Sequence, residues 1–278
     1  MTDAAFDLAG LTRSYGALRA VDDVTLTVRA GARHALIGPN GAGKSTMFKL
    51  LTGEVRATAG RIHYFGTDIT RYPQPRRSRL RIAQTYQHSS VFMPLTVREN
   101  VALAAQRVQG IGTVWWRGAR RYPDRGVWAE RNLAAVGLEQ RADDLASALS
   151  HGERRQLELA LALASRPRVL LLDEPTAGMS AAESAAFVAL VKGLPAELTV
   201  IIVEHDLDVV FSLATQISVL HHGRLLATGD PDQVSADPAV QEAYLSWSAT
   251  DDDGLGNMID TEPAADPGPA RAAKEDQP

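Results

Sequence analysis

One glycine-rich segment combines the residue types that hold phosphate groups. Residues 38–45 read Gly-Pro-Asn-Gly-Ala-Gly-Lys-Ser and fit the pattern G-x-x-x-x-G-K-[ST]. Glycines let backbone N–H groups turn toward an anion without a Cβ in the way, and the N-terminus of a following helix adds its dipole. Lys44 supplies a positive charge for the outer phosphates, and Ser45 supplies a hydroxyl ligand for Mg²⁺. The segment predicts binding of a nucleoside triphosphate.

Two acidic residues follow an apolar run later in the chain. Residues 168–175 read Arg-Val-Leu-Leu-Leu-Asp-Glu-Pro, which predicts a buried strand that ends at Asp173 and Glu174. Ligands bind at the carboxyl ends of strands in open parallel sheets. Asp173 suits a contact to Mg²⁺ or its water shell, and Glu174 suits the base that polarises a water for in-line attack on the γ-phosphate. Taken alone, the pair could also cap a helix after the strand. Together with the glycine-rich segment, it predicts hydrolysis.

A second anion site is expected at residues 149–153, Leu-Ser-His-Gly-Glu. They precede a stretch with leucines at helical spacing, so Ser150 and Gly152 are expected at a helix N-terminus with free amides. Two phosphate sites in one small domain serve one nucleotide only if two chains meet head to tail.

The elements that position these residues follow from the hydrophobic pattern. A helix is predicted from near Gly43 to Gly53, residues 76–165 are mostly helical, and residues 181–194 form an alanine-rich helix. Buried strands that alternate with helices imply a parallel sheet covered on both faces, and the middle helical stretch is then an inserted subdomain. The strands are predicted at Phe6–Tyr15, Val24–Val28, His34–Ile37, Arg61–Phe65, Val169–Asp173, Thr199–Glu204 and Ile217–Leu220.

Composition narrows the functional classes. The 278 residues are 45% apolar and contain no cysteine, which excludes disulfides, cysteine-ligated zinc and thiol catalysis. No stretch approaches 18 consecutive apolar residues, and the first ten residues lack a basic cluster before an apolar run, so we expect a cytoplasmic protein. Residues 1–248 carry 27 basic and 25 acidic groups, which argues against bulk nucleic-acid binding. Residues 249–278 carry eight acidic groups, two basic groups and four prolines, and are predicted to be a disordered acidic tail.

The motifs and their order resemble the ATPase subunits of ATP-binding cassette (ABC) transporters. The resemblance covers residues 6–246 and rests on GPNGAGKST, Gln87, LSHGE, LLLDEP and His205. It implies that ATP is held between residues 38–46 of one subunit and residues 149–153 of its partner. The nucleotide contacts that it implies in these segments are Gly38, Pro39, Asn40, Gly41, Ala42, Gly43, Lys44, Ser45, Thr46, Ser150, Gly152 and Glu153.

Three further residues acquire roles only through this resemblance. Tyr15 matches the aromatic residue that stacks on adenine, although from its position alone it could be an ordinary strand aromatic. Gln87 matches the glutamine that touches Mg²⁺ and water and reports the nucleotide state to the helical subdomain. His205 matches the histidine that senses the γ-phosphate, whereas a lone histidine at a strand end is usually structural. The catalytic set implied is Glu174, His205 and Gln87.

The fold implied is a P-loop NTPase core of the α/β class with a mainly parallel sheet, an N-terminal antiparallel β subdomain and an inserted α-helical subdomain. The ATPase domain is expected over residues 1–248, with the helical subdomain at about residues 88–165.

A narrower resemblance points to the ATPase subunits of branched-chain amino acid importers. It rests on DEPTAGMS, VEHDL and the segment GDPDQVSADPAVQEAYLS, with one departure: Ser180-Ala181 stands where the family usually has Asp or Asn followed by Pro. It implies a second ATPase subunit, either a copy or a paralogue. Transmembrane permease subunits at the inner face of the membrane and, indirectly, a solute-binding protein are also implied. A urea or amide importer ATPase, a soluble ABC ATPase of DNA repair or translation, and a regulator that does not hydrolyse remain as alternatives.

Two arginine-rich segments carry weaker signals. Residues 107–128 contain three tryptophans and five arginines, which fits either a surface toward the membrane partner or packing within the helical subdomain. The run Arg76, Arg77, Arg79 and Arg81 is expected to be a solvated helix face.

Overall fold

The computed structural model describes residues 3–85, 91–108 and 124–243. The chain divides into two compact units, Met1–Gln241 and Glu242–Pro278, and all elements below belong to the first. Gln87, residues 109–123 of the Trp/Arg-rich segment and the expected acidic tail lie outside the described residues. The domain boundary expected at residues 248/249 therefore stays a prediction.

An antiparallel sheet is built from the N-terminal strands. Its residues alternate between buried and exposed positions, as expected for a sheet with one solvated face. The order is β2 (Leu18–Arg29), β1 (Ala4–Tyr15), β4 (Ala59–Tyr64), β5 (Thr67–Asp68).

A second, mainly parallel sheet carries the chemistry-bearing loops. Strands β9, β3, β8, β7 and β6 run parallel, and β10 is antiparallel to β9. Because β3 and β7 are both parallel to β8, the loop after β3 and the acids at the end of β7 emerge at the same edge. The order is β10 (Arg224–Gly229), β9 (Gln216–His221), β3 (Arg33–Ile37), β8 (Thr199–Val203), β7 (Val169–Asp173), β6 (Ile82–Gln84).

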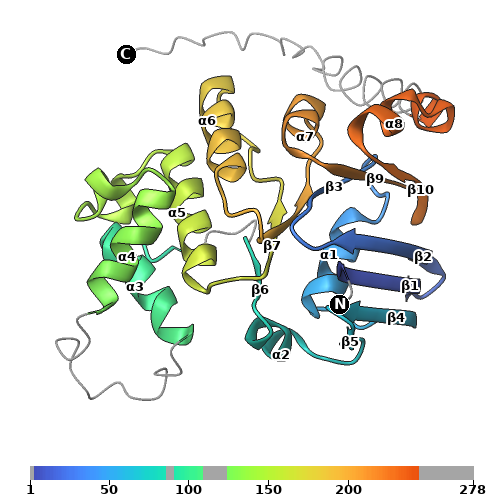
Figure 1. Ribbon diagram of the computed structural model, residues 1–278, viewed down its shortest axis with the longest axis horizontal. Coiled ribbons are helices and arrows are strands. Elements are labelled where there is room, and N and C mark those ends of the chain that lie inside the picture. The colour runs from blue at the N-terminus through green and yellow to red at the C-terminus, as the bar shows by residue number, and fades with distance from the viewer. Residues whose placement is uncertain (1–2, 86–90, 109–123, 244–278) are drawn as a thin grey trace, which may run out of the picture. The chain divides into compact units, whose positions relative to one another are not determined.

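Helix α1 (Lys44–Thr52) lies between the two sheets (Figure 1). Its apolar side chains share one core with residues of β1, β2 and β4 on one side and of β3, β7 and β8 on the other. The helix ends at Gly53, which adopts φ 80° and donates its N–H to the Lys49 carbonyl. Packing against both sheets fixes the position of α1, the helix that follows the glycine-rich loop.

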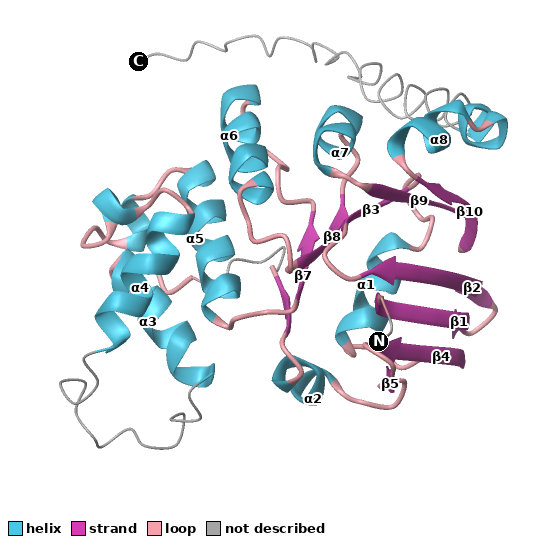
Figure 2. Ribbon diagram, in the orientation of Figure 1, coloured by secondary structure: helices cyan, strands magenta, loops and turns pink. Residues whose placement is uncertain are grey.

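A group of helices packs on the other face of the parallel sheet (Figure 2). Leu170 and Leu172 of β7 join their core, whereas Val169 and Leu171 face the α1 core, so β7 is apolar on both faces. The helices of this core are α3 (Val97–Val108), α4 (Asp124–Ala135), α5 (His151–Ala164), α6 (Ala181–Lys192) and α7 (Leu207–Leu213).

The predicted parallel sheet with helices on both faces is confirmed, with local differences. Residues 82–84 form strand β6 inside the stretch expected to be mostly helical, because they pair with β7. The short helices α2 (Gln74–Arg79), α7 and α8 (Pro231–Ala236) carried too few turns for a periodic signal. His222, with φ 47°, lies in the hairpin turn between β9 and β10.

The expectation that the arginine run at residues 76–81 is a solvated helix face is wrong at Arg77 of α2. Arg77 is 1% exposed, and its guanidinium donates to the carbonyls of Leu50 and Leu51 near the end of α1, among others. Burial lowers its pKa to about 10. A cation beside the carbonyl end of a helix is favourable, so Arg77 anchors α1 to the segment that precedes α2.

Among the residues that the structure describes, no helix combines the length and apolar character needed to span a membrane.

Candidate functional site

The glycine-rich loop between β3 and α1 forms a concave backbone segment at the edge of the parallel sheet. Gly43, the N-cap of α1, has φ 104°, and a Cβ there would lie 2.2 Å from the Ala20 carbonyl oxygen. Only glycine fits this position. No side chain caps the helix, so its first amides form the kind of N-terminus that binds phosphate.

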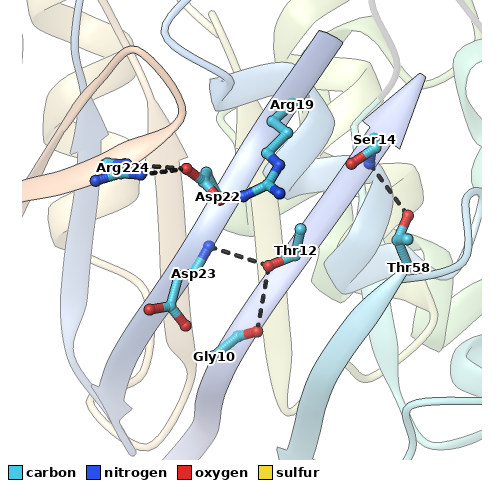
Figure 3. A network of polar contacts seen from close by, with 8 residues as sticks. All are labelled: Gly10, Thr12, Ser14, Arg19, Asp22, Asp23, Thr58 and Arg224. Atoms are coloured by element: carbon cyan, nitrogen blue, oxygen red, sulfur yellow. Dashed lines mark hydrogen bonds and ion pairs between the residues drawn. The ribbon is translucent and has the colours of Figure 1, made fainter. Parts of the chain in front are cut away.

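A polar cluster around Asp22, shown in Figure 3, is joined to this loop by backbone hydrogen bonds. The Gly223 N–H donates to the Ala42 carbonyl, and the Asp22 N–H donates to the Gly223 carbonyl. The Asp22 carboxylate accepts from Arg224 of β10 at 2.7 Å and from Arg19 of β2 at 3.0 Å. These hydrogen bonds lower the pKa of Asp22, with Arg224 as the larger cause. The two sheets are thus joined where the loop turns.

Lys44 links the loop to the acids of β7. Its Nζ donates to the carbonyls of Gly38 at 2.6 Å and Pro39 at 2.9 Å, and the residue is 9% exposed. Burial lowers the pKa of Lys44, while the charges of Glu174 and Asp173 raise it. The structure therefore brings Lys44, Asp173 and Glu174 together, as predicted from their separate motifs.

Asp173 has the character of a ligand for a hard cation. Its Oδ1 is buried and has no hydrogen-bond donor among the described residues. Burial, and then the charge of Glu174, raise the pKa of Asp173, while Lys44 and Lys49 oppose the shift. A buried carboxylate oxygen beside a phosphate-binding loop fits Mg²⁺. Ser45 has an exposed side chain in the first turn of α1, and Gln87, the third expected ligand, lies outside the described residues.

Glu174 sits on strained backbone directly after β7. Its φ is 45°, a left-handed conformation that is uncommon outside glycine, and its N–H donates to the Val203 carbonyl at 2.9 Å. Such strain persists where the surrounding structure fixes it, often at functional sites. The bond to β8 holds Glu174 at the sheet edge that also bears the phosphate loop.

Glu204 is a site residue that sequence reasoning missed. It is fully buried at the end of β8, and one carboxylate oxygen accepts from the Thr176 N–H at 3.1 Å and hydroxyl at 2.5 Å. The other oxygen accepts from the His205 N–H at 3.0 Å and lies 3.5 Å from His205 Nδ1. Glu204 thus ties the turn after Glu174 to His205, whose side chain is exposed. An acid directly after an apolar strand was the available signal.

Glu204 is therefore predicted to act as a positioning residue. Glu204→Gln is expected to lower the turnover of ATP about tenfold to hundredfold, because small displacements of reacting groups cost that much. ATP affinity should change little, since the Glu204 carboxylate accepts hydrogen bonds from Thr176 and His205 and from no described residue of the phosphate loop. Steady-state kinetics with calorimetric ATP binding separates kcat from affinity, and Glu139→Gln, at an exposed position, is the control. A folded Glu204→Gln protein with the parent kcat would contradict the role.

The segment 149–153 forms the start of α5, but its amides are not all free. Ser150 is the N-cap: its Oγ accepts from the Glu153 N–H at 3.2 Å, and the Glu153 carboxylate accepts from the Ser150 N–H at 2.8 Å. This capping box occupies the amides of Ser150 and Glu153, so the expectation of a free amide at Ser150 is wrong. Glu153 also pairs with Arg141 at 2.8 Å, so its carboxylate has structural partners within the chain.

Gly152 contacts the segment that follows Glu174. A Cβ on Gly152 would lie 2.7 Å from the Glu183 carboxylate, so a larger residue there would require the Glu183 side chain to move. Hydrogen bonds from Ser180, and more weakly from the Gly152 N–H, lower the pKa of Glu183. Ser180 is the N-cap of α6 in a second capping box with Glu183. Serine caps a helix as well as Asp or Asn does, which accounts for the departure at Ser180-Ala181.

Tyr15 lies apart from this cluster in the described contacts. It ends β1 with 42% of its surface exposed, and the Arg13 guanidinium lies 4.4 Å from its ring centroid. Its exposed ring is compatible with stacking, and its role at adenine stays a prediction.

The family comparisons agree with these features. The family described as ABC transporter matches residues 21–177. A second, described as branched-chain amino acid ATP-binding cassette transporter, matches residues 224–245.

Individual proteins are similar over most of the chain. The high-affinity branched-chain amino acid transport ATP-binding protein BraF of Pseudomonas aeruginosa is 35% identical, covering 88% of this chain and 99% of BraF. The ADP conformation of MJ1267, an ATP-binding cassette of an ABC transporter, superposes with a TM-score of 0.77 at 26% identity, covering 88% of this chain and 99% of that one. The dimeric cassette MJ0796 bound to ADP and Pi gives a TM-score of 0.69 at 25% identity, covering 81% and 98%.

Proposed function

The chain belongs to the ATP-binding subunits of ABC transporters, and from this premise we propose that it energises the uptake of branched-chain amino acids. It is a nucleotide-binding ATPase subunit with the fold of the ABC cassettes. The observation that carries the catalytic proposal is the convergence of Lys44, Asp173 and Glu174 at one sheet edge.

In the proposed mechanism, the triphosphate of ATP lies on the amides of residues 38–46 with Lys44 at its outer phosphates. Asp173, Ser45 and Gln87 would hold Mg²⁺, which neutralises phosphate charge when bound. Glu174 accepts a proton from the attacking water. As it does so, the water oxygen forms a bond to the γ-phosphorus, and the bond from that phosphorus to the leaving ADP breaks. His205, whose N–H donates to Glu204, would contact the γ-phosphate.

Each nucleotide is proposed to be completed by a second ATPase subunit. The segment at Ser150 and Gly152 of one subunit would face the γ-phosphate bound to the other. The contact of Gly152 with Glu183 supports this arrangement, because it connects that segment to the chain that follows Glu174. Driving such a closure nearly to completion requires a difference in ATP affinity between the two states of about 5 kcal/mol.

The transport partners and substrate follow from the relatives. BraF is named for branched-chain amino acid transport, and the match at residues 224–245 points to the same group. We therefore infer that permease subunits hold this chain at the inner face of the membrane and that a solute-binding protein delivers the substrate.

Co-purification and uptake together test this function. A tagged copy of the full chain, isolated from detergent-solubilised membranes of its native cells, is expected to bring polytopic permease subunits with it. Proteoliposomes that contain this complex and enclose ATP should accumulate labelled leucine when the solute-binding protein is added outside. Excess unlabelled urea serves as a competitor control. Recovery of ribosomes or DNA-repair proteins instead of permeases would exclude the transport role. Urea uptake without leucine uptake would overturn the proposed substrate.

A further inference from the structure

A cleft of about 1190 Å³ lies among residues that the ATPase mechanism does not use. Arg81 and Arg168 line it and directly precede β6 and β7, so they stand at the amino ends of these strands. Asp173 and Glu174 mark the opposite, carboxyl ends. The remaining walls come from helix α4, the end of α5 with the segment after it, the loop between α6 and β8, and the turns that contain Gly31 and Phe65. The cleft is therefore separate from the nucleotide site.

The cleft gathers positive charge that has no internal partner. Four exposed arginines line it, against the single carboxylate of Glu197. Among the described residues, none of the four forms an ion pair. Like charges in one concave site repel each other, and a bound anion relieves that repulsion. The arginines are Arg81, Arg131, Arg166 and Arg168.

Three of these guanidinium groups are held in place by contacts that leave N–H groups available. The Arg166 Cζ lies 3.8 Å from the ring centroid of Trp128, and the Arg168 Cζ lies 3.5 Å from the ring centroid of Phe65. The Arg81 Nε donates to the Arg166 carbonyl. Stacking fixes the plane of a guanidinium while its N–H fork can still bind phosphate oxygens in pairs. Groups ordered beforehand lose less entropy on binding a ligand.

Backbone strain concentrates at the same place. Six non-glycine residues in the described chain have positive φ, and three of them line this cleft. They are Phe65 at 45°, Arg81 at 68° and Arg166 at 51°. Such conformations persist where neighbouring structure imposes them, and they cluster at binding sites.

We propose that this cleft binds a small soluble molecule carrying two or more phosphate groups. Guanidinium forks match phosphate oxygens bidentately, and two or more phosphates can engage several arginines at once. The arginines converge on the cleft from separate segments rather than from one flat face, which favours a soluble molecule over a membrane surface. A ligand that contacts Arg131 of α4 together with Arg81 or Arg168 connects the helical part of the chain to the parallel sheet.

Binding of inorganic pyrophosphate tests the proposal. The full chain first receives one equivalent of ADP, which occupies the phosphate loop without saturating the cleft, and is then titrated with pyrophosphate by calorimetry. One additional site per chain is expected, with affinity that falls as salt rises. The double variant Arg166→Gln/Arg168→Gln should weaken this binding at least about tenfold, since hydrogen bonds to charged groups are worth that much. Arg131→Gln removes no hydrogen bond or ion pair found among the described residues, and it should weaken pyrophosphate binding about threefold or more.

The control variant carries the same charge change elsewhere. Arg61→Gln/Arg71→Gln removes two exposed arginines outside the cleft and should change the affinity by less than about twofold. Absence of pyrophosphate binding in the parent chain that holds one equivalent of ADP overturns the proposal. Equal weakening by the control pair also overturns it, because binding would then follow net charge alone. Binding to phosphatidylglycerol vesicles without binding to pyrophosphate would assign the arginines to a membrane surface and likewise reject the soluble ligand.

Discussion

Glu174→Gln is expected to leave ATP binding intact and to lower ATP turnover by about 10²- to 10⁴-fold, the usual contribution of a general base. Glutamine keeps the size of the side chain but cannot accept the proton of the attacking water. The backbone that places this side chain, strained at φ 45° and bonded to Val203, is unaffected by the exchange. The exchange also removes the negative charge of Glu174, one of the two carboxylates that raise the pKa of Lys44. It therefore adds no negative charge that could weaken nucleotide binding.

The same variant should accumulate as an ATP-bound dimer. If closure of two subunits depends on ATP and reopening depends on hydrolysis, then blocking the proton transfer holds the closed state. Gel filtration with and without ATP measures the dimer, and a phosphate-release assay measures turnover. Glu139→Gln, at an exposed position that is not among the proposed site residues, controls for loss of a carboxylate. Hydrolysis at the parent rate by a folded Glu174→Gln protein would refute the assignment of the base.

Lys44→Ala is expected to weaken nucleotide binding about tenfold to hundredfold, the range for losing hydrogen bonds to a charged group. The Lys44 Nζ is placed in the loop by bonds to the Gly38 and Pro39 carbonyls. Its removal also takes away the positive charge that opposes the raised pKa of Asp173. The loss should therefore be greater for ATP than for adenosine, which carries no phosphate.

Calorimetry with ATP, ADP and adenosine measures that difference. Lys192→Ala is the matched control, because Lys192 is exposed at the end of α6. Thermal unfolding of each variant without nucleotide separates loss of binding from loss of folding. Unchanged ATP affinity in Lys44→Ala would remove the lysine from the site.

Much of the nucleotide site could be predicted because its parts are contiguous in the chain. A buried strand, a glycine turn and a helix N-terminus are specified by neighbouring residues, so residues 38–46 carry their own geometry. The acids Asp173 and Glu174 were predictable for the same reason, since they end an apolar strand. The capping boxes at Ser150 and Ser180 also had a local signal, Ser-x-x-Glu, which accounts for the amides that proved to be occupied.

The sequence by itself determined the family, the phosphate loop and the order of the motifs, because each depends on residues that are near one another along the chain. Only the tertiary structure decided which distant residues meet. Glu204 bonds to Thr176 across 28 residues, and Arg77 is buried against the end of α1 although it lies in a run of arginines. The four arginines of the cleft come from three separate segments. Pairing of β6 and β7 and packing of α4 bring them together, and no local pattern encodes those long-range contacts.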